Sequence, residues 1–256
     1  MAEQKNPYAA PQVRVDDRQV SSGDRNFIEG GRIVAAGRGW QWIVEGWGLF
    51  KRFPGMWILM FIVYIVINVV LAFIPVVNLL ANLLFTVFAG GFMVACRAID
   101  EGEQLEIGHL FAGFRARTGS LVLVGVIYFG GALLLGVVLA FTMIGGIAVL
   151  ANMGPEEMLR GGLLFALMFM ALFIPIIMAY WFAPALVILK EKSAVAAMKE
   201  SFLGCLKNML PFLVYGVCAA LLAIVAMIPL GLGLLVFVPT LTASIYASYR
   251  DVYFET

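Results

Sequence analysis

Four long runs of the chain contain no Asp, Glu, Lys, Arg or His, and their lengths indicate the architecture. The runs are 53–96, 118–155, 161–189 and 208–249. A bilayer core about 30 Å thick is crossed by about 20 apolar residues of helix. Each run can therefore cross a membrane, and the first and the last are long enough to cross it twice. This pattern predicts a membrane protein that crosses the bilayer several times.

Prolines near the middle of the first and last runs, Pro75 and Pro229, divide each run into two helices. Proline removes a backbone donor and disfavours helix at the preceding residue, so we expect tight hairpins there. The spans should be helical, because lipid offers no partner to backbone groups and the alternation typical of barrel strands is absent. The sequence predicts six spans, at 55–74, 77–97, 119–142, 162–189, 210–228 and 231–250.

A short amphipathic segment precedes each pair of spans. In "GRGWQWIVEGWGLFKRFPGMW" the apolar residues recur at helical spacing, and the segments 105–119 and 194–211 have similar stripes. The three segments end alike, in "FKRFPG", "FRARTG" and "LKNMLP". The stripes are Trp40, Ile43, Val44, Trp47 and Phe50, then Ile107, Leu110, Phe111 and Phe114, and finally Val195, Met198, Phe202, Leu206 and Met209.

These patterns predict an all-α membrane protein with six transmembrane helices, arranged as three repeats of an interfacial helix plus a helical hairpin. Three similar helices that arose independently as membrane anchors are the alternative. The polar residues 1–31 lack apolar periodicity and are expected to form a disordered cytosolic tail before a transmembrane domain at 32–256. The tail contains "NPYAAP", residues 6–11, which is either a docking peptide or part of an inert tail, the latter being the simpler interpretation.

Charge adds the orientation. Hydrophobic residues make up 62% of the chain and charged residues 13%, about half the share usual in soluble domains. With six spans, every Lys and Arg except Arg160 falls on one side of the membrane. Because basic residues favour the cytosolic side, both termini are expected in the cytosol of a bacterial cell, with the protein in its inner membrane. The net charge of +1 says nothing about partners, and we expect membrane lipid rather than nucleic acid as a partner.

Tryptophan and basic side chains favour the level of the lipid headgroups. We therefore expect the three amphipathic helices to form a collar at the cytosolic surface that contacts anionic lipid. The predicted lipid-interface residues are Trp40, Trp47, Lys51, Arg52, Arg115, Arg117 and Lys207.

Reactive groups are sparse. His109 is the one histidine, the three cysteines form no C-x-x-C pair, and no hydrolase, metalloprotease or phosphate-loop motif is present. The sequence therefore predicts no catalytic residue, no metal and no cofactor. Two polar stripes have four-residue spacing, and either bind neighbouring helices, the favoured interpretation, or line a polar path. They are Asn78, Asn82 and Thr86, and Thr240, Ser244 and Ser248.

Small residues at similar spacing, as in Ala132–Gly136–Ala140 and Gly91–Ala95, predict close helix contacts in a compact bundle, and suit a homo-oligomer. At "GWQWIVEGWGLFKRFPGMWI", "AMKESFLGCLKNMLPFLVYG" and "IPLGLGLLVFVPTLTASIYASYRDVY" the sequence resembles a family of six-span proteobacterial inner-membrane proteins. In general pattern it is similar to the membrane domains of some glycerophosphodiester phosphodiesterases. The resemblance implies an inner-membrane location and carries over no catalytic residue.

Three functions remain open on the sequence. The first is a non-enzymatic role in assembly, as a scaffold or in envelope maintenance, with a membrane-protein partner or a second copy. The second is a transporter or facilitator of a small neutral or amphipathic molecule, and the third is a lipid-modifying enzyme, for which no nucleophile and base are found.

Overall fold

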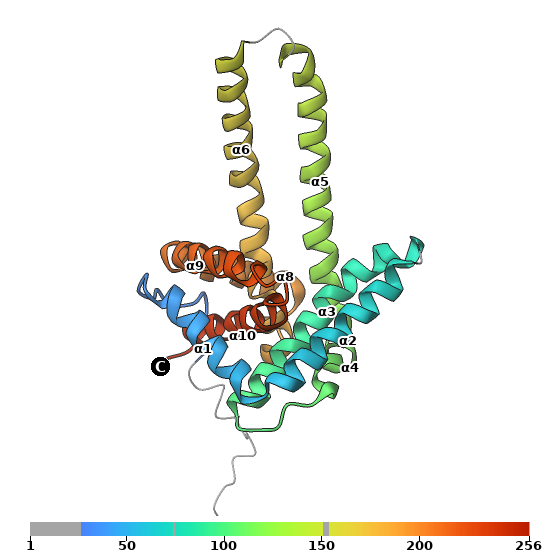
Figure 1. The fold of residues 1–256 in the computed structure, drawn as a ribbon, viewed down its shortest axis with the longest axis vertical. Helices are drawn as coiled ribbons and strands as arrows, with labels where there is room; N and C mark the ends of the chain where they lie inside the picture. Colours follow the sequence, from blue (N-terminus) through green and yellow to red (C-terminus); the bar gives the residue numbers. More distant parts are fainter. Residues whose placement is uncertain (1–26, 74, 151–153, 256) are drawn as a thin grey trace, which may run out of the picture.

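The computed structural model describes residues 27–73, 75–150 and 154–255, and their regular secondary structure is helical (Figure 1). The elements in chain order are α1 Arg38–Arg52, α2 Pro54–Ala72, α3 Pro75–Asp100, η1 Ile107–Phe111, α4 Ala112–Arg115, α5 Thr118–Leu150, α6 Pro155–Trp181, α7 Ala183–Lys190, α8 Ala194–Lys207, α9 Met209–Met227 and α10 Leu234–Tyr253. Proline occupies the first turn of α2 and α6 and begins α3, where its missing N–H costs no helical hydrogen bond. The expected breaks at Pro75 and Pro229 both separate helices.

Five helical segments are long and apolar enough to cross a membrane. They are Pro54–Ala72, Leu83–Asp100, Thr118–Thr142, Pro155–Lys190 and Met209–Met227, within the part of the chain that the structure describes. The sixth expected span, 231–250, falls in α10, which is more polar and buries eleven of its twenty residues. A helix surrounded by protein tolerates hydroxyl groups that a helix facing lipid does not. The chain is therefore an all-helical protein with five candidate spans.

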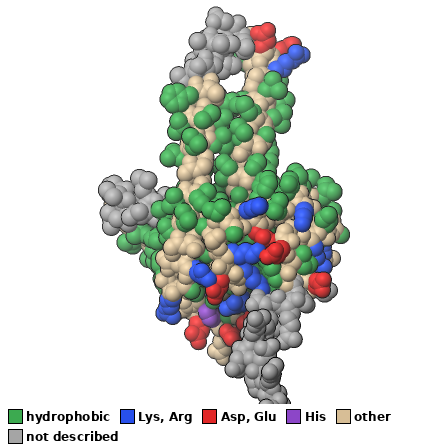
Figure 2. Space-filling view, turned by 180° about the vertical axis from the view of Figure 1, so that it is seen from behind, with side chains coloured by type: hydrophobic (Ala, Val, Ile, Leu, Met, Phe, Trp, Pro, Cys, Tyr) green, Lys and Arg blue, Asp and Glu red, His purple; other side chains and the backbone are tan. Residues whose placement is uncertain are grey.

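The hairpin of α5 and α6 projects from the rest of the molecule (Figure 1). No residue of α6 is buried. Hydrophobic side chains cover this hairpin, and charged side chains lie at its tip and over the body (Figure 2). The expected compact contact through Ala132–Gly136–Ala140 is wrong for its glycine, because no atom lies within 4 Å of where a Gly136 side chain would begin. The helix that begins at Pro155 continues as α6 to Trp181, so it starts before the expected span at 162.

The core lies in the body, where α1 packs on α9 and α10 (Figure 1). Gly46 permits this, since a Cβ there would lie 2.6 Å from both the Thr240 oxygen and the Ser244 nitrogen. Trp42 is fully buried on the same face. The expected stripe of α1 is therefore split: Ile43 and Phe50 are buried in protein, and the remaining members form an exposed edge. The sequence periodicity correctly predicted a helix at α1, but protein covers part of the face that was expected to contact lipid.

The third amphipathic segment, α8, needs the same correction. Its buried face contains Ala197, Ser201 and Cys205, whereas Val195 and Leu206 of the expected stripe are exposed. Small residues form this face because α8 packs closely on α6 and α7. The middle segment is two short helices, η1 and α4, rather than one.

Candidate functional site

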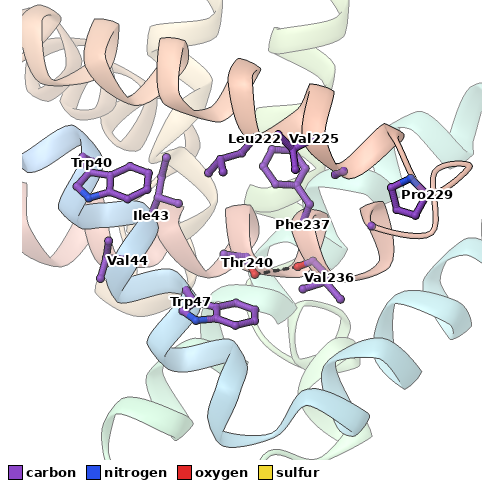
Figure 3. Close-up of a pocket in the computed structure, with 12 residues that line it drawn as sticks. Trp40, Ile43, Val44, Trp47, Leu222, Val225, Pro229, Val236, Phe237 and Thr240 are labelled. Atoms are coloured by element: carbon purple, nitrogen blue, oxygen red, sulfur yellow. Dashed lines mark hydrogen bonds between the residues drawn. The ribbon is translucent and has the colours of Figure 1, made fainter.

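An apolar groove runs along the exposed edge of α1, and we call it the α1 groove (Figure 3). Its volume is about 500 Å³, and its walls come from α1, α9, α10 and the turn between the last two. Thr240 is the one residue with a side-chain hydroxyl in the lining, and this hydroxyl donates to the Val236 carbonyl oxygen at 2.8 Å. The groove therefore suits hydrocarbon. Its lining is Trp40, Ile43, Val44, Trp47, Leu222, Val225, Ala226, Pro229, Gly233, Val236, Phe237 and Thr240.

Four predicted lipid-interface residues lie together on α1 beside this groove. Trp40 and Trp47 are each more than two-fifths exposed. The Lys51 ammonium lies 5.8 Å from the centre of the Trp47 ring, and the Arg52 guanidinium donates to the Ile99 carbonyl oxygen at 2.8 Å. An indole with a cation over its face is a common arrangement at the headgroup level.

The other three lie elsewhere. Arg115 lines a separate polar pocket of about 360 Å³, together with Arg97 and His109. Arg117 forms an ion pair with Glu191, and the Lys207 ammonium donates to the Gly31 carbonyl oxygen at 2.9 Å. The structure thus gathers part of the predicted set on α1, and Arg52, Arg117 and Lys207 have hydrogen-bond or ion-pair partners within the protein. Lipid contact by any of them stays a prediction.

Polar side chains at the C-terminal end of α10 form a network that sequence reasoning missed. Asp251, 2% exposed, accepts hydrogen bonds from Arg38 Nε at 2.6 Å, Trp42 Nε1 at 2.7 Å and Arg32 Nη2 at 2.8 Å. Burial acts to raise the pKa of Asp251, but the hydrogen bonds from Arg38, Trp42 and Arg32 outweigh it and hold the pKa below its ordinary value. We call these four residues the Asp251 cluster. It ties the beginning of α1 to the end of α10.

The cluster continues along α1 and reaches α3. Glu45 pairs with Arg38 at 3.0 Å and with Arg250 at 3.2 Å, and Arg250 also pairs with Asp100. In the sequence, the available sign of this polar network was the charged pair Arg250–Asp251, which directly follows an apolar run. Its partners are about two hundred residues away in the sequence, so spacing alone could not identify them.

The segment 27–34 is held against α8 and the end of α10, and we call this the N-terminal clamp. The Phe27 ring stacks on Tyr253 with centroids 5.6 Å apart, and the Ile28 amide donates to the Tyr253 carbonyl at 2.8 Å. Asn208 accepts from the Val34 amide and donates to the Arg32 carbonyl, both at 2.8 Å. Residues 27–31, which were expected in the tail, therefore pack on the body of the protein. The motif at 6–11 lies outside the described residues.

The described residues of the two polar stripes form hydrogen bonds to a neighbouring helix or to their own helix. Thr86 donates to the Leu121 carbonyl of α5 at 2.8 Å, and the Ser244 hydroxyl lies 2.8 Å from that of Tyr215 on α9. Ser248, like Thr240, donates to a carbonyl of its own helix. The side chains of Asn78 and Asn82 lie outside the described residues, so the polar path stays a prediction.

Comparison with known proteins gives one match. A probable inner membrane protein of Burkholderia thailandensis is 31% identical over 227 residues, which cover 84% of this chain and 82% of that protein. No family model and no solved structure matches. Together with the five candidate spans, the match identifies an integral membrane protein. The likeness to glycerophosphodiester phosphodiesterase membrane domains stays a prediction.

Proposed function

We propose that this chain, which belongs to the same family as the probable inner membrane protein of Burkholderia thailandensis, is a non-enzymatic scaffold of the bacterial inner membrane. In this role it supports the assembly of a larger complex or the maintenance of the envelope. Its partner is a membrane protein or a second copy of the chain.

The topology that goes with this role has six spans and places both termini in the cytosol. The order of the elements supports three repeats, since α1, η1 with α4, and α8 each precede two long helices. α10 is then the sixth span, shielded from lipid by α1, α2, α3 and α9. The basic residues support the orientation, because with six spans all but Arg160 share one side, and basic residues favour the cytosol.

The observation that carries the scaffold role is the N-terminal clamp. A scaffold has to hold its docking segment in a fixed place, and the clamp fixes Phe27, to which the preceding residues are joined in the sequence. Two cations lie near the Phe27 ring, with the Lys190 ammonium 5.1 Å and the Lys192 ammonium 4.7 Å from its centre. Gly30 and Gly31 both have positive φ, at 73° and 66°, and turn the chain onto α8. Many contacts therefore hold this short segment in place.

The polar side chains of the body support the same role. Ser201, Asn208 and Asp251 are buried and use their hydrogen bonds to join one helix or segment to another. Such groups stiffen a body on which partners assemble. Anionic lipid contacts the α1 edge in this proposal, with the hydrocarbon in the α1 groove and the phosphate near Lys51.

Affinity purification of the full chain from native membranes in mild detergent tests the role. The wild type should bring down a defined partner in fixed stoichiometry, or a second, differently tagged copy. Replacing residues 6–11 by Gly and Ser should abolish recovery of the partner, while the same replacement at residues 20–25 serves as the control. Recovery of the chain alone, with its lipids retained, would count against the proposal.

A second candidate function, facilitated passage of a small neutral or amphipathic molecule, is favoured by a cavity bounded by α2, α3, the α6–α7 junction and α10. Flux into liposomes that falls on Asn82→Leu, with unchanged protein insertion, would support this function. Flux equal to that of empty liposomes would remove it.

A further inference from the structure

That cavity, which we call the aromatic cavity, has a volume of about 250 Å³ and lies where three helical hairpins meet. Half of its lining residues are aromatic, and no Asp, Glu, Lys or Arg side chain is among them. The Phe61 and Phe92 rings stack with centroids 4.6 Å apart, and the Phe85 and Tyr180 rings stack at 6.1 Å. Walls of this kind suit a flat, uncharged ring.

Two consecutive lining residues carry buried donors without a partner. The hydroxyl of Tyr180 and the indole N–H of Trp181 make no hydrogen bond within the described part of the chain. The Trp57 N–H is a third, and its ring stacks on Phe92 of the cavity wall at 6.2 Å. A buried donor left without an acceptor is destabilising, and an indole N–H can only donate. The donor atoms of Tyr180 and Trp181 are shielded from the cavity itself, so a ligand with accepting oxygens satisfies them when these side chains turn toward it.

The wall that carries these donors is fixed by hydrogen bonds. α6 ends at Trp181 and α7 begins at Ala183, so the helix axis breaks at this point. Ser201 of α8 spans the break, because its hydroxyl accepts from the Phe182 amide at 2.8 Å and donates to the Met178 carbonyl at 2.7 Å. Tyr180 and Trp181 directly precede this interruption, and both line the cavity.

We propose that the aromatic cavity binds a flat, uncharged ring bearing carbonyl oxygens, which is the chemistry of a quinone. The ring stacks against the Phe and Tyr side chains, and its oxygens accept from Tyr180 and Trp181. Such a molecule dissolves in the bilayer and reaches the cavity from lipid. The site is independent of the scaffold role, since it involves neither the N-terminal clamp nor the α1 groove.

The test is binding to the full chain in lipid nanodiscs, with empty nanodiscs subtracted. The probe is radiolabelled 2-methyl-1,4-naphthoquinone, and 2-methylnaphthalene is the matched ring without oxygens. Tyr180→Phe should weaken quinone binding roughly three- to tenfold, the effect of one hydrogen bond, and leave naphthalene binding unchanged, whereas Trp181→Phe, which also shrinks the wall, should weaken quinone binding more than naphthalene binding. Trp40→Phe, in the α1 groove, should alter neither.

Stability of the ligand-free protein separates a binding role from a structural one. Tyr180→Phe removes an unsatisfied hydroxyl and should leave the thermal midpoint unchanged or raise it, whereas loss of a structural hydrogen bond would lower it. If a variant fails to fold, binding to the wild type alone tests the proposal, because the wild type should bind the quinone more tightly than the naphthalene. Equal binding of the two rings, absence of saturable quinone binding, or unchanged binding in both variants would overturn the proposal.

Discussion

Replacing Asp251 by Asn tests whether the Asp251 cluster holds α1 on α10. The substitution keeps the size of the side chain but removes the charge that two guanidinium groups and an indole N–H share. Removing one partner from a fully buried ion pair costs about 3–5 kcal/mol. Arg32 and Arg38 are each about 30% exposed, so water takes over part of their solvation. We therefore expect a loss of about 2 kcal/mol.

Thermal denaturation of the detergent-solubilised protein measures the loss. The matched control is Glu191→Gln, which breaks the ion pair with Arg117, because both side chains of that pair are largely exposed. Exposed pairs contribute about 0–1 kcal/mol, so the control should change the midpoint little. Equal shifts for the two variants would refute the reasoning, since they would mean that burial of Asp251 adds nothing to its interactions.

The pH dependence gives an independent check of the same cluster. The pKa of Asp251 is lower in the folded protein than its ordinary value, because hydrogen bonds from Arg38, Trp42 and Arg32 outweigh the effect of burial. Its contribution is complete above about pH 4, the ordinary value, and is lost as the pH falls through the lower folded pKa. The wild type should therefore lose stability more steeply than Asp251→Asn below about pH 4. Parallel curves would exclude Asp251 as the cause.

Three further predictions concern packing, lipid and orientation. Gly46→Ala should destabilise the protein by about 1–3 kcal/mol in thermal denaturation because its Cβ meets the α10 backbone, whereas Gly48→Ala, with open space around it, should be neutral or stabilising. Replacing Trp47, Lys51 and Arg52 of α1 together should lower stability in detergent more than replacing Glu156, Glu157 and Arg160 of α6 together. Equal effects would count against the collar. Single cysteines at Arg160 and Lys199, in a cysteine-free background, should react with impermeant reagent from opposite sides, and labelling from one side would contradict the orientation.

The breaks at Pro75 and Pro229 were predictable, because proline cannot donate a hydrogen bond within a helix. The bounds of α5 and α6 were not, since both extend beyond the expected spans and Pro175 lies inside α6. The direction of each apolar face was less predictable. Protein and lipid are both apolar, so periodicity finds a stripe but cannot say which of the two covers it. In α1 the residues Gly39 and Gly46, two turns apart, were the signal for close contact with protein.

Long-range polar contacts were beyond the sequence. Lys207 was assigned to lipid on its charge, and the structure gives it the Gly31 carbonyl 176 residues earlier in the chain. The aromatic cavity escaped notice for a related reason, since its lining comes from four separated parts of the chain. Composition identifies such residues as apolar, but only the fold brings them together around an empty space.

The joining of the chain's beginning to its end has a consequence for how the protein is made. The Trp42 N–H has no access to its acceptor, Asp251, until 209 further residues have been synthesised. Ribosomes add about 5–20 residues per second, so this takes about 10–40 s. During that interval lipid or the insertion machinery has to shield the first helix. A chain that stops short of its last helix keeps that surface open, and this gives proteolytic surveillance a direct means of recognising unfinished molecules.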